Sequence, residues 1–344
     1  MLRRVSNPPN PYSLSTVEYL GEQPPVKLTV FEEAAASIIS RNKSPDIGFE
    51  YSINPYRGCF HACSYCYARP THQYIDFGAG TDFERKIVIK VNAAERLREA
   101  FMKRSWKGDT LVFSGVTDCY QPLEASYELT RKCLEVCLEF RNPVSIITKG
   151  ALILRDLELL RELNQAARAH VTISLAFSDG EMARAVEPHA PHPSARLRAL
   201  RELSSAGIKT AVALSPIIPG LNDTQIPEVL QRASDAGAQT AFMTLLRLPA
   251  EVKDVFLERT KEAFPQRFGK IVSSITAMKA GQLNRSQFGK RMQGEGQRWD
   301  AISWLFDSSC ERLGLNSGEI HEVANSEQVA TFRRPTPQLD MFDS

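Results

Sequence analysis

The chain alternates short apolar runs with longer segments of helical period, and this alternation limits the folds that it can adopt. The runs are rich in Val, Ile and Leu, as are strands buried on both faces of a sheet, and the segments carry apolar residues three and four positions apart. Six runs, each followed by such a segment, are "KIVIKV", "DTLVFSGV", "PVSIITK", "HVTISLAF", "IKTAVALSPI" and "QTAFMTLLRL". Six units of this kind predict a parallel sheet covered by helices.

Within the α/β class, we predict a barrel. No GxGxxG follows any of the six predicted strands, which disfavours a dinucleotide-binding sheet and favours a partial (β/α)6 barrel of the TIM type. Functional residues of such a barrel lie at the carboxyl ends of its strands. The predicted units are an N-terminal extension (1–47), the barrel (48–268), an irregular and helical C-terminal extension (269–324) and a flexible polar tail (325–344).

The apolar runs and the cysteine count limit the cellular location. The longest runs, such as "TAVALSPIIPGL", are interrupted by proline and too short to span a bilayer, and "MLRRVSNPPNPYS" lacks the apolar region of a secretory signal. We therefore expect a cytoplasmic protein. The seven cysteines are an odd number and few for 344 residues, so no disulfide framework is expected; clustered cysteines in a reducing compartment more often bind metal or perform chemistry.

Three of the seven cysteines, Cys59, Cys63 and Cys66, lie together in "GCFHACSYCYARPTH". A structural zinc site needs four protein ligands, and would here recruit His61, His72 or a distant cysteine. The CxxxCxxC spacing is unusual for zinc. A 4Fe-4S cluster held by only three thiolates instead leaves one iron open to a small molecule. We predict that the three cysteines are metal ligands of this second kind.

The stretch "CFHACSYC", with Tyr65 as the aromatic residue before the last cysteine, resembles the signature of the radical S-adenosylmethionine (radical SAM) superfamily. The resemblance implies that the loop after the first barrel strand holds a 4Fe-4S cluster. It also implies that S-adenosylmethionine binds the open iron, and that an electron donor drives its cleavage to a 5'-deoxyadenosyl radical. Tyr65 is then expected beside the cofactor.

Further stretches resemble the uncharacterised bacterial branch of this superfamily that is related to spore photoproduct lyase. They are "INPYRGC", "CYARPTH", "TDCYQP", "ITKG", "EPHAPHP" and "RLP". The resemblance extends over most of the chain and implies an enzyme with lyase-like chemistry in DNA repair. It does not name the substrate.

The same resemblance implies three polar residues at the cofactor. "GVTDCYQPLE" is similar to the Thr-Asp element of that branch, which places Thr117 and Asp118 at the amino group of S-adenosylmethionine. Alternatively, Asp118 caps a helix that begins near Glu124. Ser174, in "TISLAF", lies where the family has a polar residue that reaches the carboxylate or the ribose, although a hydroxyl within an apolar strand is also compatible with a core position.

"PIIPGLND" is similar to the GxIxGxxE element of the family, with Pro216 in place of the first glycine and Asp223 in place of the glutamate. The similarity implies that Ile218 packs against the adenine of the cofactor, with Gly220 matching the second glycine. A proline-glycine turn also forms without any ligand.

The hydrogen-atom donor is not matched. In spore photoproduct lyase a cysteine directly before the Thr/Ser-Asp element returns a hydrogen atom to the substrate, but this chain has Gly115 and Val116 there. Cys119 and Tyr120, just after the element, are our catalytic candidates for a hydrogen-atom relay. Burial as a small core residue is the alternative for Cys119.

Two stretches carry a local excess of basic side chains despite the formal net charge of +2. Residues 85–107 contain eight basic and two acidic residues, and residues 279–298 contain five and one. A solvated helix face explains the first stretch, whereas the second combines glycine, arginine and an aromatic residue, as do segments that contact phosphate backbones. We therefore predict DNA as a partner.

The C-terminal "QLDMF" resembles the QL(S/D)LF pentapeptide by which bacterial DNA polymerases and repair proteins bind the sliding clamp. Such a short linear motif places apolar side chains in a pocket of its partner and a polar one at the rim. The sequence therefore predicts the sliding clamp as a second partner. The residues of the motif are Gln338, Leu339, Asp340, Met341 and Phe342.

Three functions follow from these features. The favoured one is a radical SAM enzyme that acts on a damaged or modified DNA base or another nucleic-acid substrate. The second keeps the radical chemistry but assigns an RNA or peptide substrate. The third is a non-catalytic, metal-bearing module that binds DNA and the sliding clamp. Iron analysis and a cofactor-cleavage assay discriminate the third from the first two.

Overall fold

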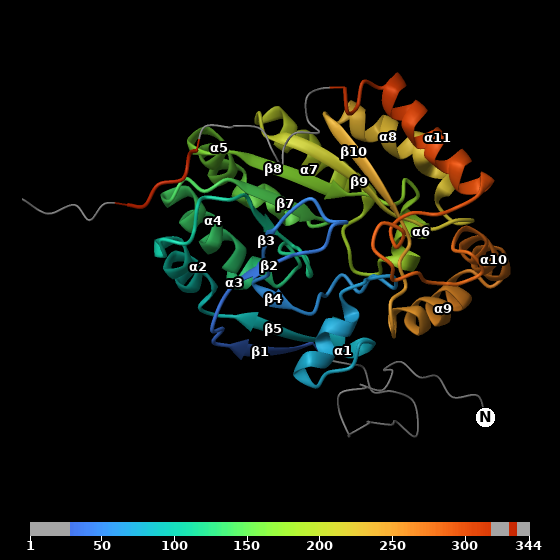
Figure 1. Cartoon of the computed structure of the whole chain (residues 1–344), viewed down its shortest axis with the longest axis horizontal. Coiled ribbons are helices and arrows are strands. Elements are labelled where there is room, and N and C mark those ends of the chain that lie inside the picture. The colour runs from blue at the N-terminus through green and yellow to red at the C-terminus, as the bar shows by residue number, and fades with distance from the viewer. Residues whose placement is uncertain (1–27, 318–329, 336–344) are drawn as a thin grey trace, which may run out of the picture.

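The computed structural model describes residues 28–317 and 330–335, and its centre is a seven-stranded sheet of order β10-β9-β8-β7-β6-β3-β2 (Figure 1). Strand β2 (Ile39–Arg41) is antiparallel to β3, and the other strands are parallel to one another. The parallel strands are β3 (Tyr51–Ile53), β6 (Leu111–Phe113), β7 (Val144–Thr148), β8 (Ala169–Ser174), β9 (Lys209–Ile217) and β10 (Thr240–Leu245). The predicted partial (β/α)6 barrel is confirmed.

Helices connect consecutive parallel strands and lie outside the curved sheet (Figure 1). They are α2 (Ala93–Met102), α3 (Glu124–Tyr127), α4 (Leu129–Glu139), α5 (Leu157–Ala166), α6 (Gly180–Val186), α7 (Pro193–Ser205) and α8 (Ile226–Asp235), with short 3-10 helices η2 (Ala151–Asp156) and η3 (Asp223–Gln225). Leucines at helical spacing, such as Leu160 and Leu163 of α5, are fully buried in the main core. Each contributes about 1.5–3 kcal/mol relative to an exposed leucine.

The strand predicted first in the barrel belongs to another sheet. "KIVIKV" does form β5 (Lys86–Lys90), but β5 pairs with β1 (Thr29–Glu33) and β4 (Tyr56–Arg57) in a separate three-stranded sheet. The first barrel strand is β3, whose three residues are too few to produce a recognisable pattern. Between β4 and β5 the chain forms the 3-10 helix η1 (Arg69–Ile75) and helix α1 (Thr81–Arg85). An apolar run predicts a buried strand but not its neighbours, because strand pairing is non-local.

After the barrel, α9 (Val252–Ala263) and α10 (Phe268–Met278) lead to an irregular segment and then to α11 (Gln297–Arg312). The free edge of β10 is covered by this C-terminal region. The Asn316 side chain accepts a hydrogen bond from Ala241 N (2.9 Å) and donates one to Ala241 O (3.0 Å), and Leu245 N donates to Met292 O (2.8 Å). Such cover prevents an exposed edge from pairing with other chains. None of the helices described here is both long and apolar enough to cross a membrane.

The two edges of the open barrel are joined by side chains. The loop after β2 carries Asp46, which forms an ion pair with Arg291 and accepts a hydrogen bond from Gly289 N (2.6 Å). Ser44 of the same loop accepts a hydrogen bond from Arg291. Because the neighbouring Met292 bonds to the end of β10, this loop and the 289–292 segment close the gap between β2 and β10.

The predicted flexible tail is not uniformly free of the domain. Residues 330–335 pack on it, with the Phe332 ring 5.8 Å from that of Phe101 and 6.1 Å from that of Phe140. Arg334 donates hydrogen bonds to the carbonyl groups of Phe101, Lys103 and Trp106 at 2.7–3.0 Å. Because the tail is mostly polar, its sequence did not indicate that Phe332 packs on the domain. Gln338–Phe342, the predicted clamp motif, lies outside the described residues.

We expect Phe332→Ala to lower the free energy of unfolding by about 2 kcal/mol, because it removes a half-buried ring from an aromatic cluster. Urea unfolding followed by circular dichroism measures this change. Arg333→Ala is the control, since the Arg333 side chain is exposed and forms no hydrogen bond or ion pair with another described residue, while its backbone N–H donates to Phe140 O at 2.9 Å. Equal unfolding midpoints for the two variants would show that the aromatic contact contributes nothing.

Candidate active site

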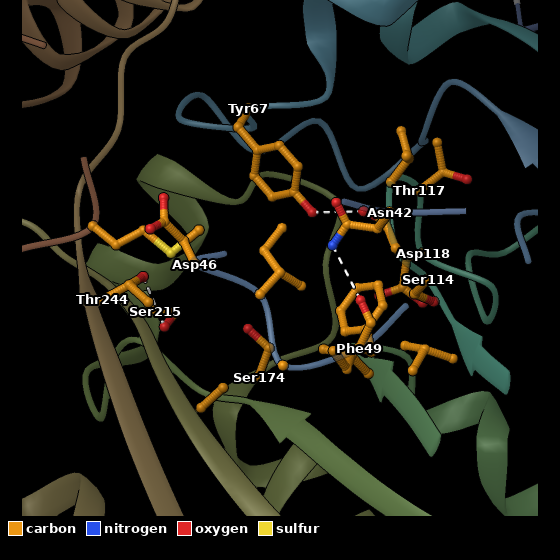
Figure 2. Close-up of a pocket in the computed structure, with 18 of the residues that line it drawn as sticks. Asn42, Asp46, Phe49, Tyr67, Ser114, Thr117, Asp118, Ser174, Ser215 and Thr244 are labelled. Carbon is orange, nitrogen blue, oxygen red and sulfur yellow. Dashed lines mark hydrogen bonds between the residues drawn. The ribbon is translucent and has the colours of Figure 1, made fainter. Parts of the chain in front are cut away.

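A cavity of about 1110 Å³ opens at the carboxyl ends of the barrel strands. Its wall is formed by the cysteine loop, by residues at the ends of β6 to β10 and by the loop after β2 (Figure 2). Functional residues were predicted at this end of the barrel, where the side chains of several strands converge. Its volume lies just above the roughly 300–1,000 Å³ of typical small-molecule sites.

Cys59, Cys63 and Cys66 all line this cavity. The loop begins at Gly58, which has a φ of +79°; a Cβ on this residue would lie only 2.8 Å from Phe83 O, so there is no space for a side chain. Cys59 N then donates to Phe83 O at 2.9 Å. The sequence thus turns three thiols toward one space.

Burial raises the pKa of all three thiols, to about 12 for Cys63. The Cys63 and Cys66 thiolates would raise the pKa of Cys59, and the Cys66 thiolate would raise that of Cys63, so three thiolates at one wall require a positively charged partner such as a metal centre. A cluster of several irons supplies that charge and spreads the sulfurs over separate ions. Across the described ranges, no three His, Cys, Asp or Glu side chains are gathered around a position for a single metal ion. The donor set therefore fits a 4Fe-4S cluster.

Of the two histidines considered as zinc ligands, His61 lines the same cavity, whereas His72 does not. His61 Nδ1 lies 3.4 Å from Asp118 Oδ2. His72 Nε2 donates a hydrogen bond to Lys86 O at 2.8 Å, and burial lowers the pKa of His72 to about 4. Neither side chain is a fourth ligand beside the three thiols in this arrangement.

A buried arginine holds the cysteine loop in shape. The guanidinium of Arg69 is fully buried and forms an ion pair with Glu84, which also pairs with Arg259 of α9 at 2.6 Å. Arg259 donates a further hydrogen bond to Ala62 O at 3.1 Å. The carbonyl groups that accept hydrogen bonds from Arg69 are those of Ala62, Cys63, Ala79 and Gly80. This role of Arg69 was not predicted, and the sequence indicates it only through the stretch "CYARP", which contains Arg69.

Tyr65 lines the cavity, as expected, and ties the loop to the segment before α7. Its hydroxyl donates a hydrogen bond to Glu187, whose carboxylate is also paired with Arg196; both charged side chains are buried. Ser64 N donates to Val186 O at 2.9 Å. The loop is therefore fixed from a second side.

Asp118 lines the cavity and is held by four donors. Its carboxylate accepts hydrogen bonds from Thr148 Oγ1 (2.5 Å), Lys149 N (2.7 Å) and Tyr120 N (2.9 Å), beside the His61 contact. Burial alone would raise the pKa of Asp118, but His61 and these hydrogen bonds hold the pKa below its usual range. Asp118 is therefore a buried carboxylate. Helix α3 has no side-chain cap, so the capping alternative is wrong.

Thr117 and Ser174 also border the cavity. The Thr117 hydroxyl donates to Tyr56 O at 2.8 Å, which fixes the turn after β6. Ser174 is the last residue of β8 and is 6% exposed.

Lys149, directly after β7, lines the cavity and was not predicted as a site residue. Burial alone would lower the pKa of Lys149, but the negative charges of Cys63, Glu187 and Asp118 outweigh this effect and raise it. The stretch "ITKG" contains Lys149, but nothing in it indicates that this lysine faces the site.

Ile218 and Gly220 are not among the residues that line the cavity, and their contact with the cofactor stays a prediction. Ile218 is fully buried and packs with Cys63 and Tyr65 in a second core cluster. Gly220 has a φ of +82° and donates its N–H to Asp223 Oδ1 at 2.9 Å, as a turn requires. Pro216 is the residue of this element that reaches the cavity.

Cys119 and Tyr120 are likewise not among the residues that line the cavity, and the hydrogen-atom relay stays a prediction. They are 0% and 1% exposed and belong to the main core, where the Tyr120 hydroxyl donates to Asp156 Oδ2 at 3.1 Å. The turn that bonds Tyr120 N to Asp118 directs both side chains inward. Tyr67, which follows the third cysteine and was missed, lies in the cavity instead (Figure 2).

Comparison with known proteins agrees with this geometry. The profile of the Radical SAM superfamily matches residues 53–233. An uncharacterised protein of Mycobacterium tuberculosis is 37% identical over 230 residues, which cover 65% of this chain and 68% of that protein. A protein of Pseudomonas phage M6 named Radical SAM Nalpha-GlyT isomerase is 22% identical over 66% of this chain and 46% of its own length.

Among solved structures, spore photoproduct lyase complexed with dinucleoside spore photoproduct has a TM-score of 0.60 and 16% identity, covering 83% of this chain and 81% of that chain. At this identity the likeness concerns the fold. The superfamily profile spans more than half of the chain and includes the three cysteines of the cavity. The chain therefore belongs to the radical SAM superfamily.

Proposed function

We propose that this radical SAM protein acts on a nucleic-acid substrate, and that the substrate is a damaged or modified DNA base. The observation that carries the proposal is the shared cavity of about 1110 Å³, in which the three thiols, the Asp118 carboxylate and the Lys149 ammonium group border one space. The volume leaves room for a substrate beside the cofactor.

The cofactors of the superfamily are a 4Fe-4S cluster and S-adenosylmethionine. When bound and reduced by one electron, they supply methionine and a 5'-deoxyadenosyl radical that takes a hydrogen atom from the substrate. In this chain Cys59, Cys63 and Cys66 would hold three irons, and the fourth would be left for S-adenosylmethionine.

The charged side chains of the cavity suit the two ends of the amino acid moiety. Asp118 would attract the ammonium group, and its His61 contact, the longest of the four at 3.4 Å, is the one that the ligand would replace. Lys149 and Ser174 would face the carboxylate, because both border the cavity at the ends of adjacent strands. The assignment of Lys149 rests on charge complementarity.

Support for a nucleic-acid substrate comes from two sides. The solved structure of spore photoproduct lyase, which shares this fold, contains a dinucleoside spore photoproduct. The basic, glycine-rich segment of residues 279–298 borders the cavity through Met292.

The clamp motif, Gln338–Phe342, would bring the enzyme to DNA. Deletion of residues 338–342 is expected to abolish capture of the protein by the sliding clamp.

The test is an anaerobic assay of the reconstituted protein with dithionite and S-adenosylmethionine. We expect 5'-deoxyadenosine to form, and to form faster with ultraviolet-irradiated DNA than with undamaged DNA. Stimulation by RNA or peptide but not by DNA would assign the second function. One zinc per chain, with no iron, no sulfide and no cleavage, would assign the non-catalytic module.

A further inference from the structure

Arg247 is a cation on the cavity wall that forms no ion pair with any acidic side chain of the described residues. It follows β10 and lines the cavity, and its buried Nε has no hydrogen-bond partner in the described part of the chain. Burial and the nearby Arg291 lower the pKa of Arg247 by more than Tyr67 and Asp46 raise it. A buried N–H donor of a charged group destabilises the fold when it has no hydrogen-bond partner. The unpartnered Nε–H of Arg247 therefore indicates that a ligand provides the partner.

The neighbouring cations differ from Arg247 because they have partners. Arg291 is paired with Asp46, and Arg285 with Glu295. The ammonium group of Lys279 donates a hydrogen bond to Arg291 O at 3.2 Å, while burial, Arg247 and Arg285 lower its pKa to about 8. These groups add positive potential around Arg247, and within residues 28–317 and 330–335 no acidic side chain forms an ion pair with it.

Two aromatic side chains stand in the same cavity and are unusually exposed. Tyr67 is 49% exposed and Phe242 is 42% exposed, and both line the wall. The Arg247 Cζ lies 5.7 Å from the centre of the Tyr67 ring. The Tyr67 hydroxyl donates to Gly115 O at 2.8 Å, which fixes the ring across the cavity from Ser174 and Ser215 (Figure 2).

We propose that Arg247 binds a backbone phosphate of a nucleic-acid strand whose bases stack on Tyr67 and Phe242. This inference rests on the proposed function and states how that substrate is held. A guanidinium forms two parallel hydrogen bonds with a phosphate, and its positive charge matches the phosphodiester. Exposed aromatic rings beside a cation are the usual means of holding single-stranded or extruded nucleotides. The target base would then lie between this wall and the cysteine loop.

The proposal is tested by fluorescence anisotropy of the reconstituted protein with a short labelled single-stranded oligodeoxynucleotide. Arg247→Gln is expected to weaken binding about tenfold. It is also expected to reduce the slope of log K against log salt by about 0.7, the value for one phosphate contact with a single strand. Arg247→Lys keeps the charge but loses the paired hydrogen bonds, and should weaken binding about threefold.

Lys253→Gln is the matched control. Lys253 is the first basic residue after Arg247 in the sequence, and it lies on the exposed surface of α9, outside the cavity. Its replacement removes one positive charge and should change the affinity for the strand by less than about twofold. If Arg247→Gln does not fold, the affinity of Arg247→Lys for the strand tests the proposal in its place. Equal affinities for wild type, Arg247→Lys and Arg247→Gln, or equal losses in Arg247→Gln and Lys253→Gln, would overturn the proposal, as would a wild type that binds no strand.

The 5'-deoxyadenosine assay on the same wild-type preparation separates this inference from the proposed function. Cleavage together with strand binding that is independent of Arg247 contradicts the inference alone, whereas a wild type that cleaves no S-adenosylmethionine contradicts the proposed function. A labelled RNA strand is the second arm. Tighter, Arg247-dependent binding of RNA would support the phosphate site and move the proposed substrate from DNA to RNA.

Discussion

Replacing Cys63 with alanine is expected to remove bound iron and to reduce 5'-deoxyadenosine formation to the level of an assay without protein. Cys63 lies on the wall of the cavity with two other thiols, and a cluster that depends on three thiolates is not retained by two. The variant is reconstituted under anaerobic conditions. Iron and sulfide per chain, visible absorbance and chromatography of the nucleoside products then measure the effect.

Cys310→Ala is the control for Cys63→Ala. Cys310 is 4% exposed in α11 and does not line the cavity, so its replacement removes a buried thiol of the same size from another place. We expect this variant to retain iron and activity. Wild-type iron content and cleavage in Cys63→Ala would contradict the assignment of the three cysteines as the ligands.

The parts of the site that sequence predicted are those encoded by local spacing. Cys59, Cys63 and Cys66 lie within one loop, Ser174 ends β8 and Asp118 lies in the turn after β6, so the barrel topology alone brings them to the same face. Prediction was less successful where the direction of a side chain depends on a turn. Cys119 lies next to Asp118 in the sequence, yet it is buried in the core.

Long-range pairing limited the prediction of the fold and of the cations. The apolar pattern identified β5 as a strand but could not assign it to the smaller sheet, because that depends on β1 and β4. Lys149 and Arg247 look like any other basic residue in the sequence, and only the convergence of β7 and β10 on one cavity distinguishes them. Arg69 was missed because its four carbonyl partners come from two separate turns.

Replacing Arg69 with methionine is expected to lower the free energy of unfolding by about 3–5 kcal/mol, the usual effect of removing one partner from a buried ion pair. The guanidinium is 0% exposed and pairs with Glu84, which is 5% exposed. Methionine has a similar length, but it leaves Glu84 paired with Arg259 alone among the described residues and removes the hydrogen bonds that Arg69 donates to the backbone around Cys63. Urea unfolding of the iron-free protein measures this effect without the contribution of the cluster.

Arg161→Met is the matched control, because Arg161 pairs with Glu158 on an exposed helix face and such pairs contribute about 0.3–0.5 kcal/mol. The rate at which a chelator removes iron from the reconstituted protein provides a second measurement. Arg69 holds the carbonyl groups of Ala62 and Cys63, so Arg69→Met should release iron faster than Arg161→Met at a urea concentration where both remain folded. Equal release rates would mean that the loop keeps its shape without the guanidinium, and that Arg69 stabilises only the fold around Glu84.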